Sequence, residues 1–262
     1  TALGEVALGY YHKAYEFATY PRRVISRPVQ DVFFAAYARL QHDRLSLSKA
    51  FFRANAYVVR TGFLFSSILV LIAPEFVKYV LGDKWLPMVS TFQLMIIYCL
   101  FDPLLVTAGN LLTACGAPQE MTRVRMVQLL FFVPAVIAGA SIWQTNGIAI
   151  AADGMLVVGL LLVYRLTRPY VDISLRKLFA APGLGLVLGS ATVAGIAFLS
   201  GNPIGPPSRA SYSATWAIAK TIAFSIPYLI ILLLLEWRDY RASFQSMDRM
   251  FGFSRRVRWP WS

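Results

Sequence analysis

Residues 63–81 read FLFSSILVLIAPEFVKYVL, and this stretch decides the fold class. Only Glu75 and Lys78 are charged in it. A helix needs about 20 predominantly apolar residues to cross the hydrocarbon layer of a bilayer. Together with the apolar residues that precede it, the stretch predicts a membrane-spanning helix over residues 57–81.

The composition of the whole chain agrees with a membrane protein. Of the 262 residues, 57% are hydrophobic and 15% are charged, whereas soluble domains carry about 25% charged residues. Six further spans are expected at residues 17–37, 88–115, 124–143, 147–166, 178–199 and 214–237. Asn146-Gly147 is a turn signal between the fourth and fifth spans. We therefore expect an all-α polytopic membrane protein with about seven transmembrane helices.

The basic residues alternate between the two sides of these spans. Sixteen occupy every second loop and the tail: Arg39, Arg44, Lys49, Arg53, Arg123, Arg125, Arg165, Arg168, Arg176, Lys177, Arg238, Arg241, Arg249, Arg255, Arg256 and Arg258. Four fall on the other side: Lys13, Lys78, Lys84 and Arg209. Because cytoplasmic loops carry the Lys and Arg excess, the C-terminus is expected in the cytoplasm.

Several other functions are disfavoured by the residue content. The net charge of +12 is spread between apolar runs, which is unlike the single basic face of a nucleic-acid-binding domain. Two cysteines and two histidines lack disulfide or metal-ligand spacing, so we assign no metal and no cofactor. Catalytic motifs such as a phosphate-binding glycine loop are not found. We expect a protein that is not an enzyme.

The first span is too polar for a lipid-facing helix. A continuous helical projection of residues 11–41 divides them into two halves. The polar half collects His12, Tyr15, Glu16, Thr19, Tyr20, Arg22, Arg23, Ser26, Arg27, Gln30, Asp31, Tyr37 and Gln41, with Phe33 and Phe34 as exceptions. The apolar half collects Tyr11, Ala14, Phe17, Ala18, Pro21, Val24, Ile25, Pro28, Val29, Val32, Ala35 and Ala36. A helix lying on the membrane surface would give the same pattern.

If this segment spans the membrane, its polar half faces a protein interior or water. Arg27 and Asp31 are four residues apart and can form a structural ion pair. That pair leaves Arg22 and Arg23 uncompensated. A cationic, hydrated wall suits a phosphate or pyrophosphate, which the planar guanidinium grips well. Kinks are expected at Pro21 and Pro28.

Two further embedded acids and a glycine pair stand out. Asp102 and Asp153 are candidates for an ion-coupling path, although neighbouring helices could equally satisfy them. Gly185 and Gly189 form a Gly-x-x-x-Gly pair in the sixth span, which favours close packing of helices.

The stretch ALGEVALGYYHKAYEFATYPRRVISRPVQDVFFAAYARLQHD, residues 2–43, resembles the central signature of polysaccharide-export flippases of the MOP (multidrug, oligosaccharidyl-lipid, polysaccharide) superfamily. A second matching element is APE at residues 73–75, followed by Leu81-Gly82 and Lys84-Trp85. Positions that carry the resemblance are Gly4, Gly9, Tyr10, Tyr11, Ala14, Tyr15, Pro21, Arg39, Leu40, Gln41 and Gly116. Ala35 and Ala38 replace residues that are often Pro and Ser in the family.

The resemblance implies the second, C-terminal lobe of a two-lobe, MATE-like transporter, and we expect that an N-terminal lobe precedes Thr1. It implies core helices over residues 1–167, two additional helices over 168–237 and a basic tail over 238–262. Residues 17–37 would line the cavity between the lobes, with Arg22, Arg23, Arg27, Gln30 and Asp31 facing the substrate.

The implied activity is flipping of undecaprenyl-pyrophosphate-linked oligosaccharide across the bacterial inner membrane. The implied partners are this lipid-linked oligosaccharide, membrane lipids, the N-terminal lobe and polysaccharide polymerase machinery. Two alternatives are open. An exporter of drugs or small molecules predicts acidic cavity residues, and a non-transporting subunit of an assembly complex predicts replaceable arginines.

Overall fold

The computed structural model describes residues 4–20, 27–200 and 213–251, and within them the side chains of residues 4, 27–31 and 236–251 lie outside the description. The described chain is helical. In order it forms α1 (Gly4–Ala18), α2 (Arg27–Leu40), α3 (Arg44–Leu71), α4 (Ala73–Phe76), α5 (Val89–Ala114), α6 (Pro118–Thr167), α7 (Leu175–Ser200) and α8 (Ala214–Phe251). A π-helical turn (Val77–Leu81) and a 3₁₀ helix (Asp83–Met88) connect α4 to α5. The all-α class is confirmed.

Five of the helices in the described part are long and apolar enough to cross a membrane: α3, α5 with the 3₁₀ helix before it, α6, α7 and α8 up to Leu235. A straight helix of 50 residues, the length of α6, would be about 75 Å long, far more than the ~30 Å hydrocarbon layer. Helical geometry fails in it at Trp143 and Gln144. α6 therefore comprises two limbs, as the predicted spans 124–143 and 147–166 require.

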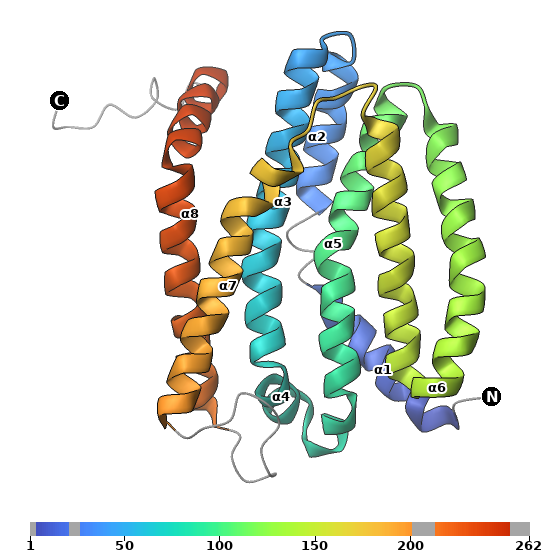
Figure 1. Ribbon diagram of the computed structural model, residues 1–262, viewed down its shortest axis with the longest axis vertical. Helices are drawn as coiled ribbons and strands as arrows, with labels where there is room; N and C mark the ends of the chain where they lie inside the picture. Colours follow the sequence, from blue (N-terminus) through green and yellow to red (C-terminus); the bar gives the residue numbers. More distant parts are fainter. Residues whose placement is uncertain (1–3, 21–26, 201–212, 252–262) are drawn as a thin grey trace, which may run out of the picture.

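Glycines pack the two limbs of α6 against each other. Gly139 and Gly147 face each other so closely that a side chain on either would collide with the backbone of the other. Farther along, the Gln128 side-chain amide donates a 3.0 Å hydrogen bond to the Met155 carbonyl oxygen. These contacts join positions on opposite limbs, so the limbs are antiparallel. α6 supplies two crossings joined by a tight turn (Figure 1).

The helix at the predicted second span, residues 57–81, both begins and ends earlier than that span. α3 begins at Arg44, where the Asp43 carboxylate accepts hydrogen bonds from the amides of Leu45 and Ser46. This is an N-cap, the arrangement that satisfies the free amides of a first helical turn. α3 ends at Leu71, and Pro74 lies in the first turn of α4, where proline is tolerated. The basic loop expected after the first span is thus largely the first turns of α3.

α7 and α8 form an antiparallel pair that packs on α3 (Figure 1). A Cβ atom added at Gly185 would lie 2.8 Å from the Tyr228 ring, and one at Gly189 would lie 2.8 Å from the Phe224 ring. The Tyr228 hydroxyl donates a 2.8 Å hydrogen bond to the Arg60 carbonyl oxygen of α3. The packing role predicted for the Gly-x-x-x-Gly pair is confirmed. The α8 helix also continues to Phe251, beyond the predicted span end at residue 237.

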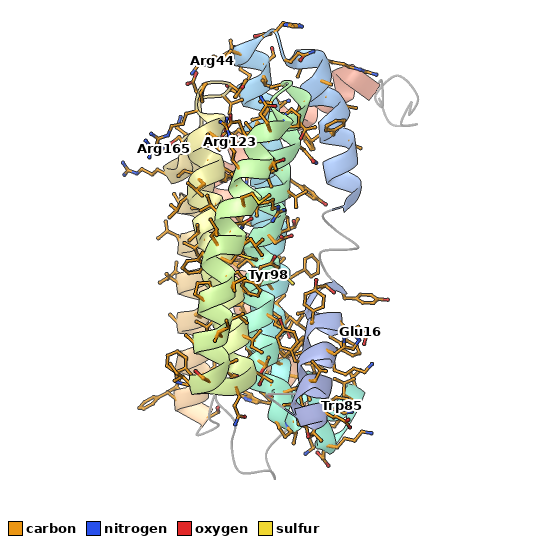
Figure 2. The ribbon with its side chains drawn as sticks, turned by 90° about the vertical axis from the view of Figure 1, so that its right-hand side faces the viewer. Glu16, Arg44, Trp85, Tyr98, Arg123 and Arg165 are labelled. Carbon is orange, nitrogen blue, oxygen red and sulfur yellow. The ribbon has the colours of Figure 1, made fainter. Side chains whose placement is uncertain are left out.

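Several arginine side chains gather at one end of the bundle. Arg44, Arg123 and Arg165 lie at that end, whereas Glu16 and Trp85 lie toward the other (Figure 2). The 168–174 connection meets the start of α3 there. Arg44 forms a 2.8 Å ion pair with Asp172, and the Asp172 amide donates to the Ser48 hydroxyl at 2.9 Å. Loops predicted to share one side of the membrane are therefore adjacent.

Candidate substrate-facing surface

The candidate surface is built on α1 and α2, which follow one another along the height of the bundle with residues 21–26 between them (Figures 1 and 2). The span expected over residues 17–37, with kinks at Pro21 and Pro28, is described as parts of two helices on either side of residues 21–26. α1 ends at Ala18 and α2 begins at Arg27, with Pro28 in its first turn. Proline lacks an amide donor and clashes with the preceding helical turn, so two prolines seven residues apart disfavour one helix.

Contacts between two elements of the resemblance hold α1 in place. The Tyr10 hydroxyl donates a 3.1 Å hydrogen bond to the Lys84 carbonyl oxygen. The Tyr10 ring packs edge-on against Trp85, with 5.7 Å between centroids. In the following turns of α1, Ala14 and Ala18 are buried, and the Phe17 ring packs edge-on against the Phe76 ring. The apolar half predicted for this part of the chain faces the bundle.

The first turns of α1 expose the apolar side chains of Val6 and Leu8, and from His12 onward its exposed face is mainly polar. His12, Tyr15 and Tyr20 are exposed. Lys13 forms a half-exposed 2.8 Å ion pair with Glu16. Thr19 departs from the predicted pattern because it is buried, and its hydroxyl donates to the Glu16 carbonyl oxygen at 3.0 Å. With that exception, the predicted polar half of α1 faces away from the bundle.

In α2 the described side chains do not divide into a polar exposed face and an apolar buried face. Tyr37, assigned to the polar half, is completely buried against Phe51, and Phe33 packs beside it. Val32, assigned to the apolar half, is 68% exposed, and Ala35 is exposed too. The projection treated residues 11–41 as one helix, whereas α1 ends at Ala18 and α2 begins at Arg27. The rotation of α2 is therefore described by its own packing against α3.

The structure does not describe the side chains of the five predicted substrate-facing residues. Arg22 and Arg23 lie outside the described residues. Arg27, Gln30 and Asp31 occupy the first turns of α2, and their side chains lie outside the description. Whether these groups converge on one cavity stays a prediction.

The two candidate coupling acids lie on different helices. Asp102 of α5 is 3% exposed and accepts a 3.4 Å hydrogen bond from Tyr98 of the same helix, which lies near mid-height in Figure 2. Asp153 of α6 lines a small cavity with Ile97 and Leu156. Within the described residues, no group of three His, Cys, Asp or Glu side chains is arranged to hold a metal ion. Cys99 and Cys115 are free thiols.

Sequence reasoning missed a buried ion pair between α4 and α8. Lys220 Nζ lies 2.6 Å from Glu75 Oε1 and donates a 2.7 Å hydrogen bond to the Leu71 carbonyl oxygen. The side chains of Lys220 and Glu75 are 2% and 5% exposed. Lys220 is the one residue between Ala214 and Leu235 that carries a charge at neutral pH. Because a charge inside a membrane helix needs a partner, its presence was the available signal.

Comparisons with known proteins bear on the family. Residues 1–90 match the family described as polysaccharide biosynthesis protein. This match supports the predicted resemblance to membrane proteins of polysaccharide biosynthesis. The matched residues include α1, α2, α3 and α4, so the family signature covers the candidate surface.

Relatives in bacteria have names from cell-surface polysaccharide synthesis. An uncharacterized membrane protein in the cps region of Klebsiella pneumoniae is 32% identical over 155 residues, covering 59% of this chain and 31% of that protein. The lipopolysaccharide biosynthesis protein WzxC of Escherichia coli is 24% identical over 176 residues, covering 67% of this chain and 36% of WzxC. The chain therefore spans about a third of the length of these relatives.

A solved structure shares the fold. The lipid II flippase MurJ, in an inward closed conformation, aligns with a TM-score of 0.69 over 89% of this chain and 48% of MurJ, at 13% identity. At this identity the likeness shows the fold alone. The chain has the fold of about half of MurJ, in agreement with the predicted all-α membrane fold.

Proposed function

We propose that this chain forms one lobe of a flippase for undecaprenyl-pyrophosphate-linked oligosaccharide in the bacterial inner membrane. The observation that carries the proposal is the α1–α2 segment, whose α1 presents its polar face away from the bundle. An amphipathic segment at the flank of a membrane bundle needs a hydrated or protein-lined space on its polar side. A second lobe facing it would enclose that space.

In this proposal the cavity is cationic, and the two lobes rock to open it to alternate sides. Arg22, Arg23 and Arg27 would bind the pyrophosphate, and Gln30 and Asp31 would complete the polar wall. Guanidinium groups bind phosphates through paired hydrogen bonds, which suits a headgroup that must be held and then released. A transport role without covalent chemistry suits a surface of this kind.

The basic end of the bundle is proposed to face the cytoplasm. That orientation follows the Lys and Arg excess and places the C-terminal end of α8 inside the cell. Asp102 and Asp153 are proposed coupling acids because each is an ionisable group embedded among membrane helices. The core over residues 1–167 and the pair of helices over residues 168–237 would belong to the same lobe.

The test uses the full-length gene with Arg27→Ala. We expect less surface polysaccharide and a larger pool of lipid-linked precursor, with normal membrane insertion. Normal polysaccharide and a normal precursor pool would contradict the cationic cavity and favour a non-transporting subunit. Loss of drug tolerance with normal polysaccharide would instead indicate an exporter of small molecules. Arg176→Ala, in the first turn of α7 and outside the α1–α2 segment, is the control for a general loss of surface charge.

A further inference from the structure

A crevice lies between the second limb of α6 and α7, away from the α1–α2 surface. Its larger part is a cavity of about 540 Å³ lined by residues of α5, α6, α7 and the 168–174 connection, among them Phe101, Leu160 and Phe179. A second cavity of about 250 Å³ continues from it toward Asp153. The two cavities share Phe101, Leu160 and Leu161, so they form one crevice.

The walls of the crevice are apolar and face the surrounding lipid. Leu161 is 70% exposed and Val157 is 54% exposed. From Arg165 to Asp153, α6 advances twelve residues, which is about 18 Å of helix. The hydrocarbon layer is about 30 Å thick, so the crevice is as long as one leaflet is deep. These dimensions suit an extended acyl chain.

The mouth of the crevice is cationic. Arg165 and Arg168 line it at the basic end of the bundle, and Arg165 is labelled there in Figure 2. The nearest carboxylate of the connection, Asp172, is already engaged by Arg44 at 2.8 Å. Among the described residues, neither Arg165 nor Arg168 has an ion-pair partner. Two guanidinium groups above an apolar slot match a phosphate joined to hydrocarbon.

We propose that this crevice binds an anionic phospholipid, with its phosphate on Arg165 and Arg168 and one acyl chain between α6 and α7. Basic pockets between membrane helices bind anionic headgroups, and arginine binds phosphate oxygens in pairs. The occupant is a lipid of the surrounding leaflet, phosphatidylglycerol in the simplest case. The site is independent of the proposed flipping function because it lies on the other side of α5 from the α1–α2 surface.

The headgroup contact is tested on the purified full-length protein by native mass spectrometry. Delipidated protein is titrated with phosphatidylglycerol or with phosphatidylcholine of the same acyl chains. The variant is Arg165→Gln/Arg168→Gln, and Arg176→Gln/Lys177→Gln removes the same charge at the same end without touching the crevice. Each basic residue near an anionic lipid contributes roughly fivefold in affinity, so the first variant should bind phosphatidylglycerol about thirtyfold more weakly. The control should change little.

The acyl contact is tested separately. Leu161→Trp fills the shared part of the crevice and should lower phosphatidylglycerol binding, whereas Leu129→Trp, on the exposed first limb of α6, should not. The site would be overturned if both charge variants lost phosphatidylglycerol binding equally, or if phosphatidylglycerol and phosphatidylcholine bound equally well. The first result would indicate a diffuse attraction of anionic lipid to the basic surface. Displacement of phosphatidylglycerol by equimolar undecaprenyl phosphate would overturn the assigned occupant.

Discussion

Lys220 of α8 and Glu75 of α4 form an ion pair with 2.6 Å between Nζ and Oε1, and both side chains are almost completely buried. Lys220 also donates to the carbonyl oxygen of Leu71, the last residue of α3. One side chain thus joins α8 to the point where the chain turns from α3 into α4. Because Glu75 belongs to the APE element of the resemblance, the pair connects the family signature to the C-terminal helices.

Lys220→Met should destabilise the protein strongly. Removing one partner of a buried pair leaves an uncompensated charge and costs about 3–5 kcal/mol. The matched control is Arg123→Met, which removes an exposed pair with Glu120 at the same distance of 2.6 Å and should cost less than about 1 kcal/mol. Thermal unfolding in detergent measures both. Lys220→Met/Glu75→Leu should recover much of the loss, and a Lys220→Met variant as stable as the control would contradict a stabilising pair.

Gly185→Val and Gly189→Val should separate α7 from α8. Each added Cβ would lie 2.8 Å from an aromatic ring of α8, and overpacking of this kind costs about 1–3 kcal/mol. Gly183→Val is the control on the same helix, since a Cβ there meets nothing within 4 Å. Disulfide crosslinking between cysteines introduced in α7 and α8 reports the separation, together with thermal stability. Equal behaviour of all three variants would argue against the glycine contact.

Reporter fusions should place the two ends of the bundle on opposite sides of the membrane. A fusion after Lys84 should report the periplasm and a fusion after Lys177 the cytoplasm, because the basic excess lies at the second end. The ion pair of Arg44 with Asp172 adds that a fusion after Asp43 should agree with the one after Lys177. The same location for the fusions after Lys84 and Lys177 would refute the topology.

The protein should also lose stability at acid pH, because the Asp43 carboxylate that caps α3 becomes protonated. Hydrogen bonds from Ser46 hold the pKa of the Asp43 carboxyl below its ordinary value of 3.8. Since the pKa is lower in the folded state, the cap stabilises above the ordinary value and is lost as pH falls through the folded pKa. Asp43→Ala should lower Tm at neutral pH, and its deficit relative to wild type should shrink below about pH 4. A deficit that is constant with pH would show that the carboxylate charge is not involved.

Hydropathy predicted those parts of the fold that depend on the sequence of a single helix. The span predicted over residues 88–115 corresponds to α5 (Val89–Ala114), and the turn inside α6, at Trp143 and Gln144, falls just before the predicted turn at Asn146-Gly147. Gly185 and Gly189 could be assigned to packing because their spacing places both on one face of a helix. These features depend on local sequence, so no knowledge of the partner helix was needed.

Features that depend on a distant partner were not predictable in the same way. Lys220 and Glu75 are 145 residues apart, and neither residue indicates the other. The burial of Tyr37 depends on the packing of α2 against Phe51 of α3, which a helical projection of residues 11–41 does not contain. Tyr10 and Trp85 belong to two separate sequence motifs, and their contact is visible only in the folded chain.

The most direct test of the account is the distribution of undecaprenyl-pyrophosphate-linked oligosaccharide between the two leaflets. Cells carrying the full-length gene are labelled with a membrane-impermeant reagent that reacts with oligosaccharide on the outer leaflet. The account predicts that a correctly inserted Arg22→Ala/Arg23→Ala/Arg27→Ala variant lowers the labelled fraction as far as depletion of the protein does. Arg176→Ala/Lys177→Ala should leave that fraction unchanged. A normal labelled fraction in the triple variant would contradict a cationic wall on the α1–α2 segment.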